Sequence, residues 1–205
     1  MPTILLVRHA ENEYLTAGRM AGRLNDIHLN ENGRRQAHEL AENLAQWPVK
    51  AVFSSPLERT METAQPIAQA QGLRVIPREG LLEIDVGEWQ DKTLKSLRRR
   101  KLWRNVQFSP SRVSFPGGES LSNAQQRIVA ELETIRISQK SQDLVVCVSH
   151  SDPIKLAIAY YAGIALDLFQ RIIVSPASVS ALQFGETSVR LLMVNYQFSI
   201  NLKKI

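Results

Sequence analysis

Two histidines each follow a short apolar run, although the two runs lie far apart in the chain. An expected strand over residues 3–7 is followed two residues later by His9, and one over residues 144–148 is followed two residues later by His150. In an open α/β sheet, ligands bind beyond the carboxyl ends of the parallel strands. Two strands that end in this way would bring both imidazoles to one crevice, and the pair indicates chemistry on an anion.

Two arginines would give this crevice positive charge. Arg8 directly precedes His9, and Arg59 falls in the first turn of an expected helix. A helix N-terminus offers unpaired N–H groups and partial positive charge, and an arginine there adds a two-pronged donor that suits phosphate oxygens. Neighbouring cations also lower the pKa of a histidine, which keeps a ring nitrogen unprotonated and nucleophilic. Taken alone, however, each arginine would more often form an ordinary surface ion pair.

The elements that must position these residues alternate between β-like runs and stretches of helical period. This alternation is typical of βαβ units and predicts an α/β fold, a three-layer α/β/α sandwich with a mostly parallel central sheet. The first strand is apolar on both faces, which predicts a central place in the sheet. Strands are expected over residues 3–7, 51–54, 73–76 and 144–148, helices over 37–45, 57–68, 121–135 and 153–161, and a closing hairpin over 178–194.

Two of the expected helices carry start signals. Ser55, Pro56 and Glu58 form the pattern of a capping serine, a proline at the first helical position and a glutamate at the third. Asn30 or Asn32 would cap the helix over residues 37–45.

The length of 205 residues and the hydrophobic content of 44% predict one domain, residues 1–205. The alternation of elements breaks at about residues 77–119, where glycines and prolines punctuate a charged segment. Insertions at the carboxyl ends of strands often act as lids or specificity elements, although many are only peripheral helices.

Composition narrows the class of protein further. No apolar run approaches the roughly 20 residues that cross a bilayer, and a single cysteine without a secretory signal favours a soluble cytoplasmic protein. The net charge of +5 suits an anionic substrate, a nucleic acid or neither. Because no metal-binding motif is present, we expect no metal and no other cofactor.

Six segments, in order along nearly the whole chain, closely resemble the histidine phosphatase superfamily, also called the phosphoglycerate mutase-like family. The signature Arg-His-Gly-Glu-Ser/Thr corresponds to Arg8-His9-Ala10-Glu11-Asn12, and Ser-Pro-Leu-x-Arg corresponds to residues 55–59. The other similar segments are residues 26–37, 81–90, 115–120 with Arg127, and 148–150. A chain of this length is more similar to the cofactor-independent phosphatases than to the longer glycolytic mutases.

The resemblance implies a reaction and a role for each residue. His9 would attack phosphorus in line and form a phosphohistidine, which water would hydrolyse. Glu83 would protonate the leaving oxygen and then accept a proton from the water. The phosphoryl oxygens would be held by Arg8, Arg59 and His150. The implied function is metal-independent hydrolysis of a small phosphorylated metabolite. Asp85 and Glu88 are alternative candidates for the general acid beside Glu83.

Some positions depart from the family pattern. Ala10 and Asn12 stand where glycine and serine or threonine are usual, and Leu15 replaces a frequent asparagine. One polar contact to the transferred phosphate would then be missing or supplied by Asn12. Ala10 and Leu15 also motivate the hypothesis of a phosphoester sensor without catalysis. Arg19 and Arg23 follow the signature, where solvation at the surface is the simpler interpretation.

Two further functions are alternatives to hydrolysis: a mutase reaction at the same site, and nucleic-acid binding by a basic stretch. A phosphoglycerate-type mutase would use the same site, with an acceptor phosphoester in place of water. Nucleic-acid binding is disfavoured because no known motif accompanies the basic stretch. That stretch comprises Lys92, Lys95, Arg98, Arg99, Arg100, Lys101 and Arg104, with Trp103. The natural substrate and the oligomeric state, a homo-oligomer included, stay open.

Overall fold

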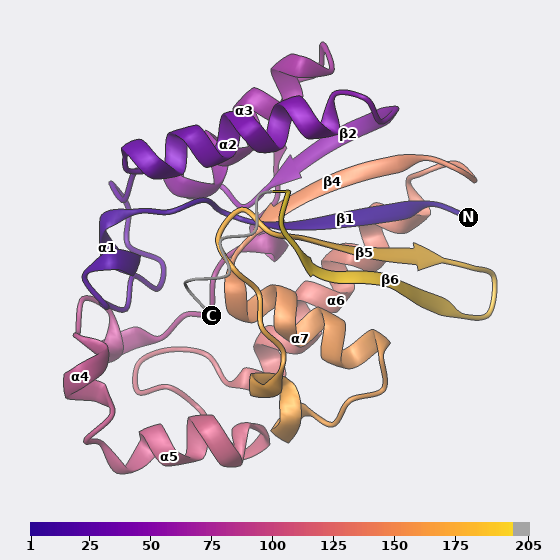
Figure 1. Ribbon diagram of the computed structural model, residues 1–205. Coiled ribbons are helices and arrows are strands. Elements are labelled where there is room, and N and C mark those ends of the chain that lie inside the picture. Colours follow the sequence, from indigo (N-terminus) through magenta and orange to yellow (C-terminus); the bar gives the residue numbers. More distant parts are fainter. Residues whose placement is uncertain (199–205) are drawn as a thin grey trace.

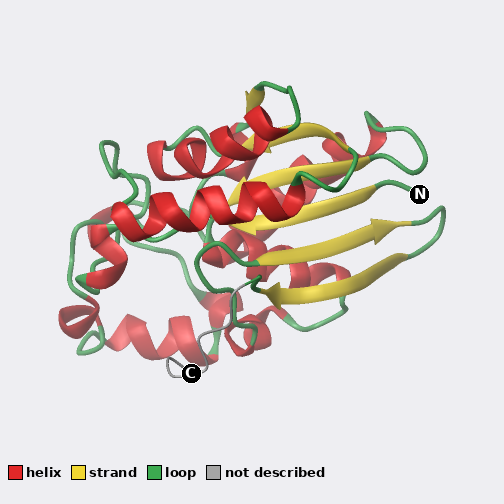
Figure 2. Ribbon diagram, turned by 45° about the horizontal axis from the view of Figure 1, so that its top comes forward, coloured by secondary structure: helices red, strands yellow, loops and turns green. Residues whose placement is uncertain are grey.

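The computed structural model describes residues 1–198 and contains one six-stranded sheet (Figure 2). The strand order is β3-β2-β4-β1-β5-β6, in which the first four strands run parallel, β5 runs antiparallel to β1, and β6 runs antiparallel to β5. β1 is interior, as its apolar character predicts. The strands are β1 (Thr3–Arg8), β2 (Val49–Ser54), β3 (Val75–Pro77), β4 (Leu144–Ser149), β5 (Val179–Phe184) and β6 (Val189–Tyr196).

Helices cover both faces of the sheet (Figure 1), which confirms the three-layer architecture. Alternate β1 residues point to opposite faces, as the pleat of a strand requires. Leu5 and Val7 pack in the same cluster as α2 (Glu31–Leu44) and α3 (Glu58–Ala70). Ile4 and Leu6 pack in the cluster of α6 (Leu121–Ile137) and α7 (Ser151–Tyr161). In the adjacent strand β4, the only cysteine of the chain, Cys147, lies fully buried in this second cluster.

The register of the sheet explains how the two histidines meet. Arg8 of β1 pairs with Ser149 of β4, so the residues that follow them, His9 and His150, leave the sheet at the same carboxyl edge. The amide of His9 still donates to the Ser149 carbonyl at 2.9 Å. On the other side of β4, the amide of Ser55 donates to the carbonyl of Val148.

The two predicted caps have different outcomes. Asn30 caps α2, because its side chain accepts from the amide of Gly33. The predicted cap at Ser55 is wrong, since α3 begins at Glu58 after Leu57, which makes no capping hydrogen bond. The physical reason is that the Ser55 amide still belongs to the sheet ladder, which extends the strand geometry past the position where the local pattern would start the helix.

Residues 77–119 form short helices beyond the carboxyl ends of the parallel strands (Figure 1). Trp89 anchors this segment, with its ring stacked on Trp103 at 6.1 Å and edge-to-face with Phe115 at 5.2 Å. The helices are η1 (Glu79–Leu81), η2 (Gly87–Trp89), α4 (Leu94–Leu97), α5 (Lys101–Phe108) and η3 (Pro110–Arg112). Elsewhere lie α1 (Glu13–Thr16) and η4 (Leu166–Arg171). The domain end expected at residue 205 lies outside the described residues.

Candidate active site

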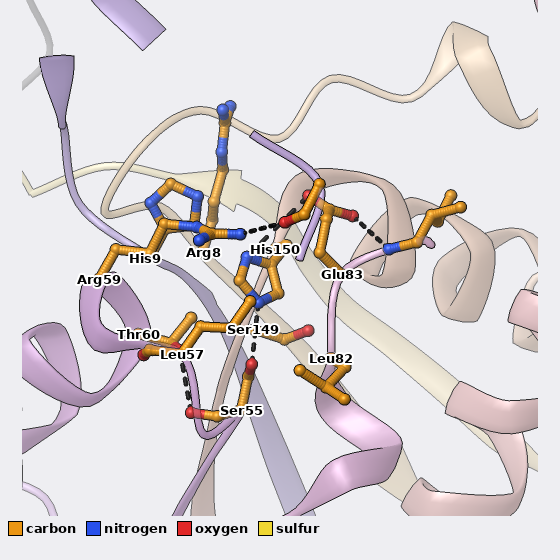
Figure 3. A network of polar contacts seen from close by, with 12 residues as sticks. Arg8, His9, Ser55, Leu57, Arg59, Thr60, Leu82, Glu83, Ser149 and His150 are labelled. Carbon is orange, nitrogen blue, oxygen red and sulfur yellow. Dashed lines mark hydrogen bonds and ion pairs between the residues drawn. The ribbon is translucent and has the colours of Figure 1, made fainter. Parts of the chain in front are cut away.

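Five of the predicted site residues meet at the carboxyl edge of the sheet (Figure 3). The rings of His9 and His150 lie 5.2 Å apart between centroids. Nδ1 of His150 lies 3.9 Å from Oε2 of Glu83. A pocket of about 160 Å³ is lined by Arg8, His9, Arg59 and Glu83, among others. The structure thus brings together groups from β1, α3, β4 and the loop after η1.

The geometry of His9 fixes which ring nitrogen is available. Its Nδ1 lies 2.8 Å from the carbonyl oxygen of Ala10. Because a carbonyl only accepts, Nδ1 carries the proton, and in the neutral ring Nε2 keeps its lone pair. Burial, and then the charges of Arg8 and Arg59, hold the pKa of His9 well below its ordinary value. The ring is therefore neutral near pH 7, as a nucleophile requires.

The two arginines are held by backbone carbonyls. Arg8 donates from Nη1 to the Val174 carbonyl at 2.7 Å, and Arg59 donates from Nη2 to the Gly22 carbonyl at 2.6 Å. Burial lowers the pKa of both arginines, although a guanidinium stays charged in proteins. Gly22 has a φ of +54°, and a Cβ atom there would lie 2.8 Å from the Gln90 side chain. Glycine therefore suits the turn that receives Arg59.

Glu83 has the environment of a proton donor. Its side chain is 19% exposed, and Oε1 accepts from the amide of Ile84. Burial first, and then the negative charge of Asp152, raise the pKa of Glu83 to about 7. The competing carboxylates, Asp85 and Glu88, do not line the pocket, and Asp85 accepts from the nearby Gly87 amide.

His150 is fully buried between Ser55 and Glu83 (Figure 3), behind the residues that line the pocket. Its Nε2 lies 2.9 Å from the Ser55 hydroxyl, and its Nδ1 has no hydrogen-bond partner among the described residues. Burial, and then the charge of Arg59, lower the pKa of His150 well below its ordinary value. A buried nitrogen without a partner is costly, so Nδ1 is suited to bind a polar group in the pocket.

Three charged residues behind the pocket hold the loop that carries Glu83. Glu119 Oε1 accepts from Arg23 at 2.9 Å and from Arg127 at 2.7 Å. Arg23 and Arg127 both donate to the backbone carbonyl of Glu83, at 2.8 and 3.3 Å. The interpretation of Arg23 as a solvated surface residue is therefore wrong. Glu119 and Arg127 belong to a matching segment, but no local pattern in that segment indicates their shared contact with the loop.

Asn12 lies buried in the pocket wall, where it caps α1 by accepting from the amide of Leu15 at 3.0 Å. Its contact with a phosphate stays a prediction. The basic residues of the stretch from Lys92 to Arg104 are exposed on and around α4 and α5, and their binding to nucleic acid also remains untested.

Within residues 1–198, the structure has no group of three or more side chains placed to hold a metal ion. Over the same residues, no helix has the length and apolar character that crossing a membrane requires.

Residues 4–197 match the family model of the histidine phosphatase superfamily (branch 1), and the chain belongs to this superfamily. It is 35% identical to phosphoserine phosphatase 1 of Hydrogenobacter thermophilus, over 95% of this chain and 92% of that one. It is 28% identical to a protein of Yersinia pestis named "Probable phosphoglycerate mutase GpmB", over 91% and 87% of the two chains. Among solved structures, the Entamoeba histolytica phosphoserine phosphatase in complex with 3-phosphoglyceric acid superposes with a TM-score of 0.85, at 25% identity over 97% and 98% of the chains.

Proposed function

We propose that this chain hydrolyses the phosphate monoester of a small metabolite through a phosphohistidine at His9, without a metal ion. One observation carries the proposal: Nε2 of His9 keeps its lone pair beside the buried Arg59 and the half-buried Arg8. The superfamily and the phosphoserine phosphatase relatives support a phosphatase. Because its pKa is raised, the Glu83 carboxyl can act as the acid that the reaction needs.

The first step transfers the phosphoryl group to the protein. Nε2 of His9 attacks phosphorus, the bond from phosphorus to the ester oxygen breaks, and the Glu83 carboxyl gives its proton to the leaving oxygen. The charge on the phosphoryl oxygens is stabilised by Arg8, Arg59 and His150.

The second step returns the protein to its starting state. A water oxygen attacks phosphorus, the bond from phosphorus to Nε2 breaks, and Glu83 takes a proton from the water. Inorganic phosphate then leaves. In a mutase, an acceptor hydroxyl would replace this water. Because the chain is similar to the Yersinia protein, the experiment below also distinguishes a mutase from a phosphatase.

The segment over residues 77–119 contributes both to catalysis and to the pocket wall, because Glu83 and Leu94 line the pocket. This position supports its assignment as the specificity element of a single domain. A cytoplasmic location completes the proposal. It is supported by the low cysteine content and the burial of Cys147.

The test is phosphate release from a panel of monoesters in EDTA, with quenched trapping of an acid-labile phosphoenzyme. The panel contains phosphoserine, 3-phosphoglycerate and phenyl phosphate. Wild type should turn over at least one ester and become labelled, and His9→Ala should do neither. His38→Ala is the matched control, because His38 is exposed on α2 away from the pocket.

Full turnover by the His9→Ala variant would refute the phosphohistidine. Transfer of label to an added phosphoglycerate at a higher rate than to water would identify a mutase.

A further inference from the structure

The outer part of the pocket, formed by α1, the loop after it and α4, lies beyond the carboxyl edge of the sheet (Figure 1) and is largely apolar. Leu15, which replaces the frequent asparagine of the signature, is one of its apolar side chains. The residues that line it are Tyr14, Leu15, Met20, Ala21 and Leu94, together with Arg19. Apolar walls favour apolar ligand groups, because they release ordered water and offer no hydrogen bonds to a polar group.

Arg19 is the cation of this outer wall, and it is already paired. Its Nη2 donates to the Asp91 carboxylate at 2.6 Å and to the Asp91 carbonyl at 2.7 Å. The hydroxyl of Tyr14 donates to the same carboxylate at 2.8 Å. The positive charge of Arg19 is therefore balanced, and its guanidinium is fixed on the protein.

The first turn of α7 adds negative charge to the pocket lining. Asp152 lines the pocket, and its partner Lys155 lies 2.9 Å away but does not line it. Among the described residues of the pocket wall, only Arg8 and Arg59 are cations without a carboxylate partner, and both lie at the phosphate end. A second anionic group on a substrate would meet no unpaired cation, and burying it unpaired is costly.

From this distribution, and on the basis of the proposed function, we infer that the leaving group of the substrate is uncharged and largely apolar, an aryl or alkyl alcohol that packs on Leu15, Met20 and Leu94. Esters that carry a carboxylate or a second phosphate near the scissile bond are poor substrates. The chain would thus differ in substrate class from relatives named for phosphoserine or phosphoglycerate, while it shares their phosphate site.

The test compares kcat/KM for phenyl phosphate, phosphoserine and 3-phosphoglycerate. Phenyl phosphate should exceed both others by at least about tenfold, the discrimination typical of a pocket that matches one ligand group. Equal or faster turnover of either carboxylate ester would overturn the inference and leave the proposed function intact.

Asp91→Asn gives a second, gain-of-function test. It removes the charge that neutralises Arg19, and asparagine tolerates the φ of +63° at this position. We expect kcat/KM for 3-phosphoglycerate to rise about threefold, the scale of an exposed ion pair, with phenyl phosphate unchanged. Asp26→Asn is the matched control, because Asp26 is also exposed at positive φ, whereas Arg19 pairs with Asp91. No gain with 3-phosphoglycerate would count against the role of Arg19.

Equilibrium binding keeps the inference testable if no ester is turned over. Phenylphosphonate and 3-phosphonopropionate share the anionic head but differ in the attached group. Calorimetric titration of wild type should show phenylphosphonate binding at least about tenfold more tightly. Tighter binding of 3-phosphonopropionate would overturn the inference, whereas absence of turnover with the expected order of binding would refute only the proposed hydrolysis.

Discussion

The hydroxyl oxygen of Ser55 lies 2.9 Å from Nε2 of His150, at the buried end of that imidazole. The other ring nitrogen, Nδ1, is the one on the side of Glu83. A neutral imidazole has one donor and one acceptor nitrogen. We infer that Ser55 donates its hydroxyl proton to Nε2, so that Nδ1 carries the ring proton and can donate to a phosphoryl oxygen. In this arrangement Ser55 is a positioning residue for His150.

Ser55→Ala should lower kcat/KM by about three- to tenfold, which corresponds to the loss of one hydrogen bond. Ser55→Thr keeps the hydroxyl and should recover most of the activity. Steady-state kinetics, with the melting temperature of each variant, would check this. A threonine variant as slow as the alanine variant, at unchanged stability, would contradict the role of the hydroxyl.

The raised pKa of Glu83 predicts a pH dependence of the first step. A general acid must be protonated, and the pKa of Glu83 is about 7. The rate of phosphoenzyme formation with an alkyl phosphate should therefore fall as the pH rises above about 7. Glu83→Gln should lower the rate about 10²- to 10⁴-fold and remove this limb. Rapid-quench measurements across pH 5 to 9 would test both, and an unchanged limb in Glu83→Gln would assign it to another group.

The same pKa predicts an effect on stability. A carboxyl whose pKa is higher in the folded state binds its proton more tightly there, so its contribution to stability is lost as pH rises from its unfolded value toward about 7. Glu83→Gln resembles the protonated form at every pH. Its melting temperature should exceed that of wild type by at least about 2 °C at pH 8, and by less at pH 5. Calorimetry would show the same difference at the two pH values if Glu83 were ionised throughout, and that result would contradict the prediction.

Arg127 should matter for both stability and catalysis, although it does not line the pocket. Arg127→Ala removes one donor from Glu119 and from each of three backbone carbonyls, and it frees the Glu83 loop. We expect a loss of about 2–3 kcal/mol in the free energy of unfolding and about tenfold in kcat/KM. Arg136→Ala is the control from the same helix, since its pair with Glu133 is more exposed and should cost at most about 1 kcal/mol. Similar losses in both variants would refute a specific role for Arg127.

The sequence predicted the parts of the fold that depend on burial. β1 is buried on both faces and reads as an unbroken apolar run, and α6 repeats its apolar residues at helical spacing. The pair of His9 and His150 was predictable because both follow strands whose carboxyl ends coincide.

Other parts of the site depend on contacts that no local pattern contains. Ser55 satisfies the rule for a helix cap, yet the ladder to β4 and the contact with His150 decide its role. A lone loop carboxylate such as Glu83 has no periodic signal, so only the family resemblance singled it out. The cluster of Arg23, Glu119 and Arg127 joins two distant parts of the chain, since Arg23 and Glu119 are 96 residues apart, and it became visible only in the folded chain.

Because Cys147 is buried, the reactivity of its thiol reports how often the folded protein opens. Its thiol lies at 0% exposure in β4, between β1 and β2, and burial raises its pKa. Because its side chain packs in the cluster of α6 and α7, an alkylating reagent reaches this sulfur only when those helices separate from the sheet. The rate of its modification by a neutral alkylating reagent therefore measures how often this core opens, at native pH and without denaturant.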